Sequence, residues 1–165
     1  MKQQRNVLKL LLAACLLQAA SGPALPADAG PLAPELVVER WHQAADKPSV
    51  KDLQGQVILL DFWGLWCAPC VKALPALNAL TRTYGDRGLA VIGIHTPAKA
   101  DQLAAFLQEH EVAFPVGEDT GKTAQRYQLR NYPTYVLIDR QGRIHTTGFT
   151  IPDNETIDKL LLARP

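Results

Sequence analysis

The sequence has no apolar run of the length that a membrane-spanning helix needs, roughly 20 residues. It also has no basic run: its 17 Lys and Arg and its 16 Asp and Glu are scattered along the chain, and the net charge is +1. A nucleic-acid-binding face would need clustered basic residues, so nucleic acid is not expected as a partner. Internal repeats and low-complexity tracts are absent as well, which excludes repeat architectures.

Cysteine is scarce: the chain has three, and only Cys67 and Cys70 form a C-x-x-C pair. A structural zinc site needs four ligands, and the sequence offers neither a second pair nor histidines at ligand spacing. A domain in a chain of this length buries a sizeable core without covalent staples, and a disulfide across two residues gains little loop-closure entropy. The pair is therefore predicted to be redox-active, with a metal ligand pair and an inert disulfide as alternatives.

Residues 1–29 are predicted to be an export signal. Three basic residues precede or flank an apolar run from Leu10 to Ala20, and Ala27-Asp28-Ala29 forms an A-x-A cleavage site. In a second interpretation, residues 12–15 form a lipobox, Cys15 becomes the lipidated first residue, and the chain reaches the membrane only through this anchor. In both cases we expect the rest of the chain in the periplasm or cell envelope, an oxidising compartment.

The remaining chain divides into a tether rich in Pro, Ala and Gly, residues 30–34, and one domain, residues 35–165. Apolar and β-branched runs predict strands, and apolar residues at helical spacing predict helices. The expected strands are 35–41 and 49–53, paired as an N-terminal hairpin, and 57–63, 89–95, 112–116, 134–139 and 143–149. The expected helices are 68–84, 98–110, 120–129 and 153–162. This order predicts an α/β fold with a mixed sheet covered on both faces.

The chemistry concentrates where the strand at 57–63 turns into the helix at 68–84. Cys67 stands at the N-terminus of that helix, where unpaired N–H groups and the positive end of the helix dipole favour a thiolate. This environment lowers the pKa of the thiol. Cys70 lies one turn further on, close enough for a disulfide. Pro69 suits the first turn because its missing N–H would have no partner there.

The motif FW-x-x-WC-x-x-C after an apolar strand resembles thioredoxins, and more closely the exported TlpA/ResA/DsbE branch. Similarity extends to the lead-in at 52–56, to an extra helix and strand between residues 98 and 116, and to Tyr132-Pro133-Thr134. The resemblance covers residues 35–162. It implies a thioredoxin-like three-layer α/β/α sandwich with a mixed central sheet, the N-terminal β-hairpin and one inserted β–α element. The branch often carries Asn where this chain has Asp61, which argues against transferring its role in cytochrome c maturation.

The resemblance implies a thiol–disulfide oxidoreductase, most simply a reductase of protein disulfides. Cys67 would attack the substrate disulfide, and Cys70 would resolve the mixed disulfide that results. Asp61 is the candidate base for Cys70. It lies in mid-strand among apolar neighbours, where burial raises a carboxyl pKa; the alternative is a solvated Asp61 at the strand edge.

Four further residues are expected to shape the site. Pro133 would be cis and pack beside the disulfide, and the backbone of Tyr132 would pair with the substrate strand. Trp66 would shield the disulfide face, and Pro69 lies between the cysteines. The redox-active disulfide would act without a metal or an organic cofactor.

Two other functions stay open. A disulfide oxidase or isomerase can use the same fold, but Ala68 and Pro69 offer no donor to stabilise the reduced thiolate, which favours a reductase. A copper- or metal-handling thiol module is the other alternative. The expected substrates are protein or small-molecule disulfides, and the resemblance implies a membrane protein as electron donor.

Overall fold

The computed structural model describes residues 30–163. The predicted export signal at 1–29, with Cys15, lies outside the described residues. The strands in chain order are β1 Val38–His42, β2 Val57–Trp63, β3 Leu89–His95, β4 Val116–Asp119, β5 Thr134–Ile138 and β6 Ile144–Gly148. The helices are α2 Ala68–Tyr84, α3 Leu103–Glu109, α4 Lys122–Arg126 and α5 Asn154–Leu162, with short 3₁₀ turns at Gly85–Arg87 and Ala100–Gln102.

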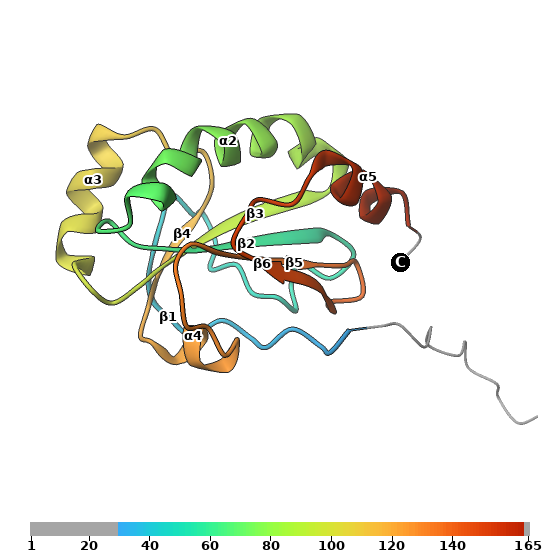
Figure 1. Ribbon diagram of the computed structural model, residues 1–165, viewed down its shortest axis with the longest axis horizontal. Helices are drawn as coiled ribbons and strands as arrows, with labels where there is room; N and C mark the ends of the chain where they lie inside the picture. The colour runs from blue at the N-terminus through green and yellow to red at the C-terminus, as the bar shows by residue number, and fades with distance from the viewer. Residues whose placement is uncertain (1–29, 164–165) are drawn as a thin grey trace, which may run out of the picture.

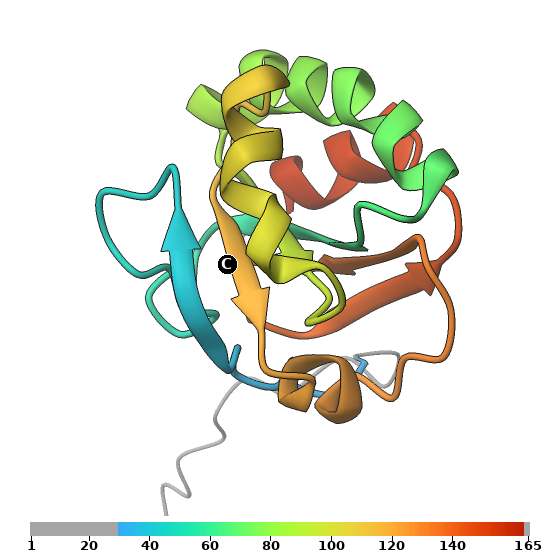
Figure 2. The ribbon, with the colours of Figure 1, turned by 90° about the vertical axis from the view of Figure 1, so that its left-hand side faces the viewer.

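One mixed sheet organises the domain, with the strand order β1-β4-β3-β2-β5-β6. The central strands β2, β3 and β4 run parallel, while β1 and β5 are antiparallel to their neighbours β4 and β2. Helices α2, α3 and α5 cover one face, and α4 lies with the N-terminal segment on the other (Figures 1 and 2). The predicted three-layer arrangement with a mixed central sheet is confirmed.

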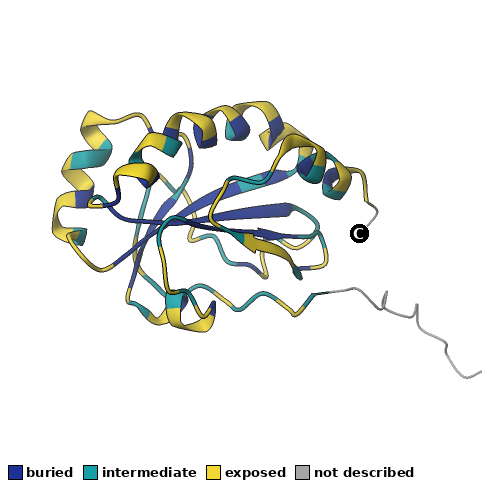
Figure 3. Ribbon diagram, viewed as in Figure 1, coloured by how far each residue is buried: buried dark blue, intermediate teal, exposed yellow. Residues whose placement is uncertain are grey.

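Strand β2 is the centre of the fold and is buried along its whole length (Figure 3). Its side chains alternate between two apolar clusters, because successive residues of a strand point to opposite faces. Leu59 and Trp63 join the cluster beneath α2, and Leu60 and Phe62 join the cluster on the opposite face. The predicted bounds of β2, α2 and β3 match the structure residue for residue, since each element has a strong and uninterrupted apolar pattern.

The prediction of an N-terminal hairpin was wrong. Strand β1 pairs antiparallel with β4, and the second expected strand, 49–53, is not formed, because residues 50–55 form turns. The carboxylate of Glu35 accepts hydrogen bonds from the backbone N–H groups of Val50 and Lys51, and Ser49 and Asp52 bond to each other. These side chains pair with backbone N–H groups of the segment, so the segment needs no neighbouring strand to accept them.

The predicted inserted helix and strand are present, but the strand begins later than expected. Val112, Phe114 and Val116 alternate inward as in a strand. However, the N–H of Ala113 donates to Asn78 Oδ1 at 2.7 Å and not to a neighbouring strand. Sheet pairing with β3 starts only after Pro115, whose carbonyl accepts from Gly93.

Residues 30–34, predicted as a tether, lie along the start of β6. The N–H of Ala33 donates to Gly142 at 2.8 Å, and the N–H of Ile144 donates to Pro31 at 2.9 Å. None of the helices within residues 30–163 combines the length and apolarity needed to cross a membrane.

Candidate active site

The C-x-x-C pair lies at the start of α2, directly after the loop that follows β2. Cys67 is the N-cap residue and Cys70 lies in the first turn, and the two sulfurs form a disulfide. The Sγ of Cys67 accepts a hydrogen bond from the N–H of Cys70 at 3.3 Å. Pro69 occupies the first turn, where a missing N–H is tolerated. A backbone N–H aimed at Cys67 Sγ stabilises a thiolate at that sulfur.

Asp61 lies in the middle of β2, on the face that α2 covers. It alternates with Leu59 and Trp63, both members of the cluster that contains Cys70. The side chain is fully buried, and neither carboxyl oxygen has a hydrogen-bond partner among the described residues. Burial raises the pKa of Asp61 to about 8. The alternative of a solvated Asp61 at a strand edge is therefore wrong.

The segment before β5 completes the surface around the disulfide. The Tyr132–Pro133 peptide bond is cis, as predicted. Trp66 is half exposed, and its ring meets the edge of the Tyr132 ring at a centroid distance of 5.6 Å. Tyr132 also packs against the apolar cluster that holds both cysteines. The half-exposed Trp66 and the partly buried Tyr132 give an apolar surface for an incoming chain.

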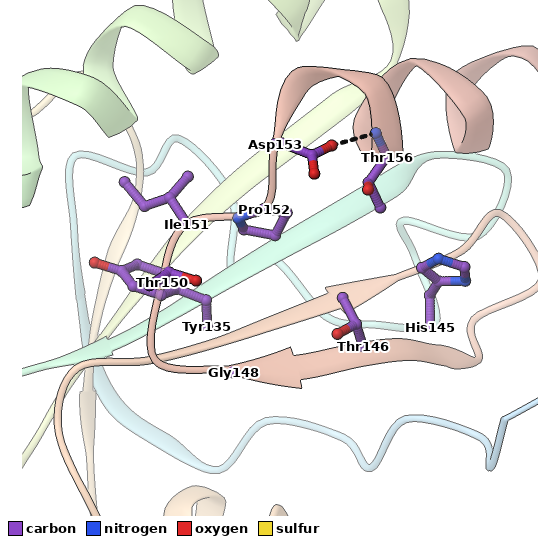
Figure 4. Close-up of a pocket in the computed structure, with 9 residues that line it drawn as sticks. All are labelled: Tyr135, His145, Thr146, Gly148, Thr150, Ile151, Pro152, Asp153 and Thr156. Atoms are coloured by element: carbon purple, nitrogen blue, oxygen red, sulfur yellow. Dashed lines mark hydrogen bonds between the residues drawn. The ribbon is translucent and has the colours of Figure 1, made fainter.

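A pocket of about 480 Å³ opens beside the site, between β5, β6 and the start of α5 (Figure 4). Tyr135 lines this pocket and is the Cα partner of Asp61 across the strand pair β2–β5. Burial, with a smaller contribution from Asp61, raises the pKa of Tyr135. On the opposite wall, Asp153 caps α5 by accepting from the N–H of Thr156 at 2.7 Å.

One residue of the site was missed at the sequence level. His95 was predicted only as the end of a strand, with no role in the site; it is the last residue of β3 and is fully buried. Its Nε2 accepts the N–H of Leu65 at 3.2 Å. The register of β2 and β3, which pairs Trp63 with His95, brings it there. No local pattern in the sequence signals this contact, because it depends on the pairing of β2 with β3.

Within residues 30–163, no group of three or more His, Cys, Asp or Glu side chains gathers in an arrangement that could hold a metal ion. A smaller group of polar side chains lies toward the edge of the sheet, between β1 and β4. There, Glu118 accepts from His42 Nε2 at 2.6 Å and lies 3.8 Å from Arg40.

Comparisons with known proteins agree with this geometry. The profile of the AhpC/TSA family matches residues 29–147. A thiol-disulfide oxidoreductase ResA of Bacillus cereus is 34% identical over 116 residues, which are 70% of this chain and 66% of the relative. The thioredoxin-like protein YneN of Bacillus subtilis (strain 168) is 34% identical over 104 residues, or 61% of each chain. The match thus spans slightly less than two thirds of these relatives.

Solved structures extend the agreement to the fold. The thioredoxin-like superfamily protein SPOA0173 superposes with a TM-score of 0.74 at 30% identity, over 82% of this chain and 100% of the other. A Chlorobium tepidum protein assigned to the DsbE thiol:disulfide interchange proteins gives 0.68 at 29% identity, over 81% and 95%. The predicted resemblance to thioredoxin-like proteins of the ResA and DsbE type is confirmed.

Proposed function

The chain belongs to the AhpC/TSA family, and on this premise we propose that it is an exported thiol–disulfide oxidoreductase that reduces protein disulfides. The observation that carries the proposal is the disulfide Cys67–Cys70 at the N-terminus of α2, with the buried carboxyl of Asp61 on the same side of the sheet. The similarity to a thiol-disulfide oxidoreductase of Bacillus cereus supports the same chemistry.

The reaction proceeds by two exchanges. The thiolate of Cys67 bonds to one sulfur of the substrate disulfide and expels the other as a thiolate. Cys70 then bonds to Cys67 and expels the first substrate sulfur, so the protein loses two electrons and the substrate gains them. The proton of Cys70 passes to Asp61. A pKa of about 8 allows this carboxyl to exchange a proton near neutral pH.

The direction of electron flow follows from the surroundings of Cys67. A strongly oxidising disulfide needs a reduced thiolate with extra stabilisation. Here Ala68 and Pro69 supply no side-chain donor, and Cys67 Sγ accepts one backbone N–H. This environment favours a reductase. Trp66 and Tyr132 would receive the substrate, with the backbone of Tyr132 beside its extended strand and Pro133 next to the disulfide.

Export and the electron supply belong to the same proposal. The chain would be delivered by the signal at 1–29, either cleaved or anchored through Cys15, with residues 30–34 joining this segment to the domain from residue 35. A reductase in an oxidising compartment needs an external source of electrons. A membrane protein would supply them, and no metal or organic cofactor would be needed.

The test is the reduction potential of the Cys67–Cys70 couple, titrated against a thiol buffer, with Cys67→Ala as the control that shows no transition. We expect roughly −270 mV or lower, the range of thioredoxin. A potential near about −120 mV would make the protein a disulfide donor. A protein with no redox transition and a bound metal would support the metal-handling alternative.

A further inference from the structure

Backbone hydrogen bonds tie the loop of residues 64–66, which joins β2 to Cys67, to the end of β3. The N–H of Thr96 donates to the carbonyl of Trp63 at 2.9 Å, and the N–H of Leu65 donates to His95 Nε2 at 3.2 Å. On the other side, the N–H of Cys67 donates to Gly64 at 2.9 Å. The conformation that presents Cys67 is therefore tied to the end of the neighbouring strand.

The loop has little room to move at this point. A Cβ atom on Gly64 would lie 2.7 Å from Cγ2 of Thr96 and 2.9 Å from the indole nitrogen of Trp66. Contacts this short do not occur in a relaxed structure. A residue larger than glycine would therefore displace the side chain of Thr96 or Trp66, so Gly64 packs closely against the segment that follows β3.

His95 is suited to act as a fixed acceptor. Because Leu65 contributes an N–H, His95 accepts it at Nε2 in the neutral tautomer with its proton on Nδ1, an atom that is buried and has no hydrogen-bond partner among the described residues. The ring meets Trp63 edge-on at a centroid distance of 5.0 Å. Burial lowers the pKa of His95 to about 4, against smaller opposing contributions from Thr96 and Glu118. The imidazole is thus neutral at neutral pH and keeps its lone pair for the loop.

We propose that His95 is a positioning residue for the thiol–disulfide exchange: by accepting the N–H of Leu65, it fixes the loop that holds Cys67 at the N-terminus of α2. The inference rests on the proposed function. Without the acceptor, the N–H of Leu65 loses its partner in a partly buried place, and the cost of leaving it unpaired favours a shift of the backbone. A shifted loop moves Cys67 away from its N-cap geometry, which weakens the stabilisation of its thiolate.

Two substitutions of His95 distinguish the effect of its acceptor nitrogen from the effect of its aromatic ring. His95→Phe keeps an aromatic ring against Trp63 and removes the acceptor. His95→Gln removes the ring and keeps an acceptor oxygen at a similar distance from the backbone. Ile94→Val, on the opposite face of the same strand, is the matched control for a general loss of packing. If His95→Phe does not fold, His95→Leu replaces it.

The measurement is the pH dependence of alkylation of Cys67 in the reduced protein, followed by mass spectrometry, together with urea unfolding of each variant. We expect the alkylation rate of His95→Phe at pH 7 to fall about tenfold with a higher apparent thiol pKa, while His95→Gln and Ile94→Val stay within about twofold of the wild type. A His95→Phe protein with a wild-type profile would overturn the inference, as would a His95→Gln protein that behaves like His95→Phe.

This readout does not require a substrate. If the wild type reduces no disulfide, the proposed function fails while the alkylation profiles still decide on His95. If the wild type is an active reductase and the profiles coincide, only the role of His95 is rejected.

Discussion

The two cysteines have different partners, and this assigns their order in the reaction. Cys67 is the N-cap of α2 and its sulfur accepts a backbone N–H, whereas Cys70 is fully buried in the first turn. We expect Cys70→Ser to accumulate a mixed disulfide between Cys67 and its substrate, because no second thiol resolves it. Mass spectrometry under non-reducing conditions detects this species. Cys67→Ser is the control and should form no adduct; adducts on Cys70 in that variant would reverse the assignment.

Asp61 is the second residue whose surroundings set its chemistry. Its carboxyl is buried without a hydrogen-bond partner in the described part of the chain, and its pKa rises to about 8. We expect Asp61→Asn to slow the resolving step by about a hundredfold, because general base catalysis is lost. Single-turnover kinetics on a preformed mixed disulfide measure this step directly. The wild-type rate should rise with pH through about 8; the same dependence in Asp61→Asn would assign the base to another group.

The sequence alone predicted some of these residues and not others, for a physical reason. Asp61 was predictable because a carboxylate within an apolar strand is costly unless it has a role. The expected roles of Trp66, Tyr132 and Pro133 followed from the resemblance to thioredoxin-like proteins. His95 was not predicted, because its contact with Leu65 depends on the register of β2 against β3. No local pattern encodes that register.

At the scale of elements, the strength of the local pattern decides what can be predicted. Helix α2 begins at a proline-containing turn and continues with apolar residues at helical spacing, so its bounds were predicted correctly. The strand that pairs with β1 was predicted wrongly, because the segment at 49–53 has the composition of a strand and was expected to pair with it. Its backbone is instead satisfied by Glu35, a long-range side-chain contact.

The docking of β1 on β4 depends on a glycine. A Cβ on Gly117 would lie 2.8 Å and 2.9 Å from the two methyl groups of Val38 and 3.0 Å from the ring of Trp41. We expect Gly117→Ala to destabilise the domain by about 1–3 kcal/mol through overpacking, measured by urea unfolding. Gly148→Ala in the edge strand β6 is the matched control, since no described residue lies within 4 Å of its Cβ position. Equal stability of the two variants would show that β1 is not packed against β4 in this way.

At the scale of the whole molecule, both faces of the sheet are packed with apolar side chains, but the groups of the proposed chemistry lie on one of them. The cluster beneath α4 and the N-terminal segment is built from apolar side chains such as Phe62, Ile92 and Ile138. The cluster beneath α2 holds the disulfide, and Asp61 and His95 lie on this face of the sheet. Both titratable groups are buried and uncharged near neutral pH in the folded state. The free energy of unfolding of the domain should therefore change with pH where either group ionises in the unfolded chain.

The free energy of unfolding of the oxidised protein should therefore depend on pH in a defined way. Asp61 has its pKa raised from 3.8 to about 8, so between these values the folded state holds a proton that the unfolded chain releases, and stability falls as pH rises. His95 has its pKa lowered from 6.5 to about 4, so in that window the unfolded chain holds the extra proton, and stability rises with pH.

The contributions of Asp61 and His95 to the pH dependence of stability cancel from about pH 4 to pH 6.5. Above pH 6.5 only the contribution of Asp61 is left. We expect the wild type to lose about 2 kcal/mol between pH 6.5 and roughly pH 8.5, since each pH unit is worth up to about 1.4 kcal/mol. Urea unfolding across this range measures the change. In Asp61→Asn only His95 titrates, so the free energy of unfolding should rise up to pH 6.5 and stay constant above it. If the free energy of unfolding of the two proteins changed with pH in the same way, the pKa of the Asp61 carboxyl would not be raised in the folded protein.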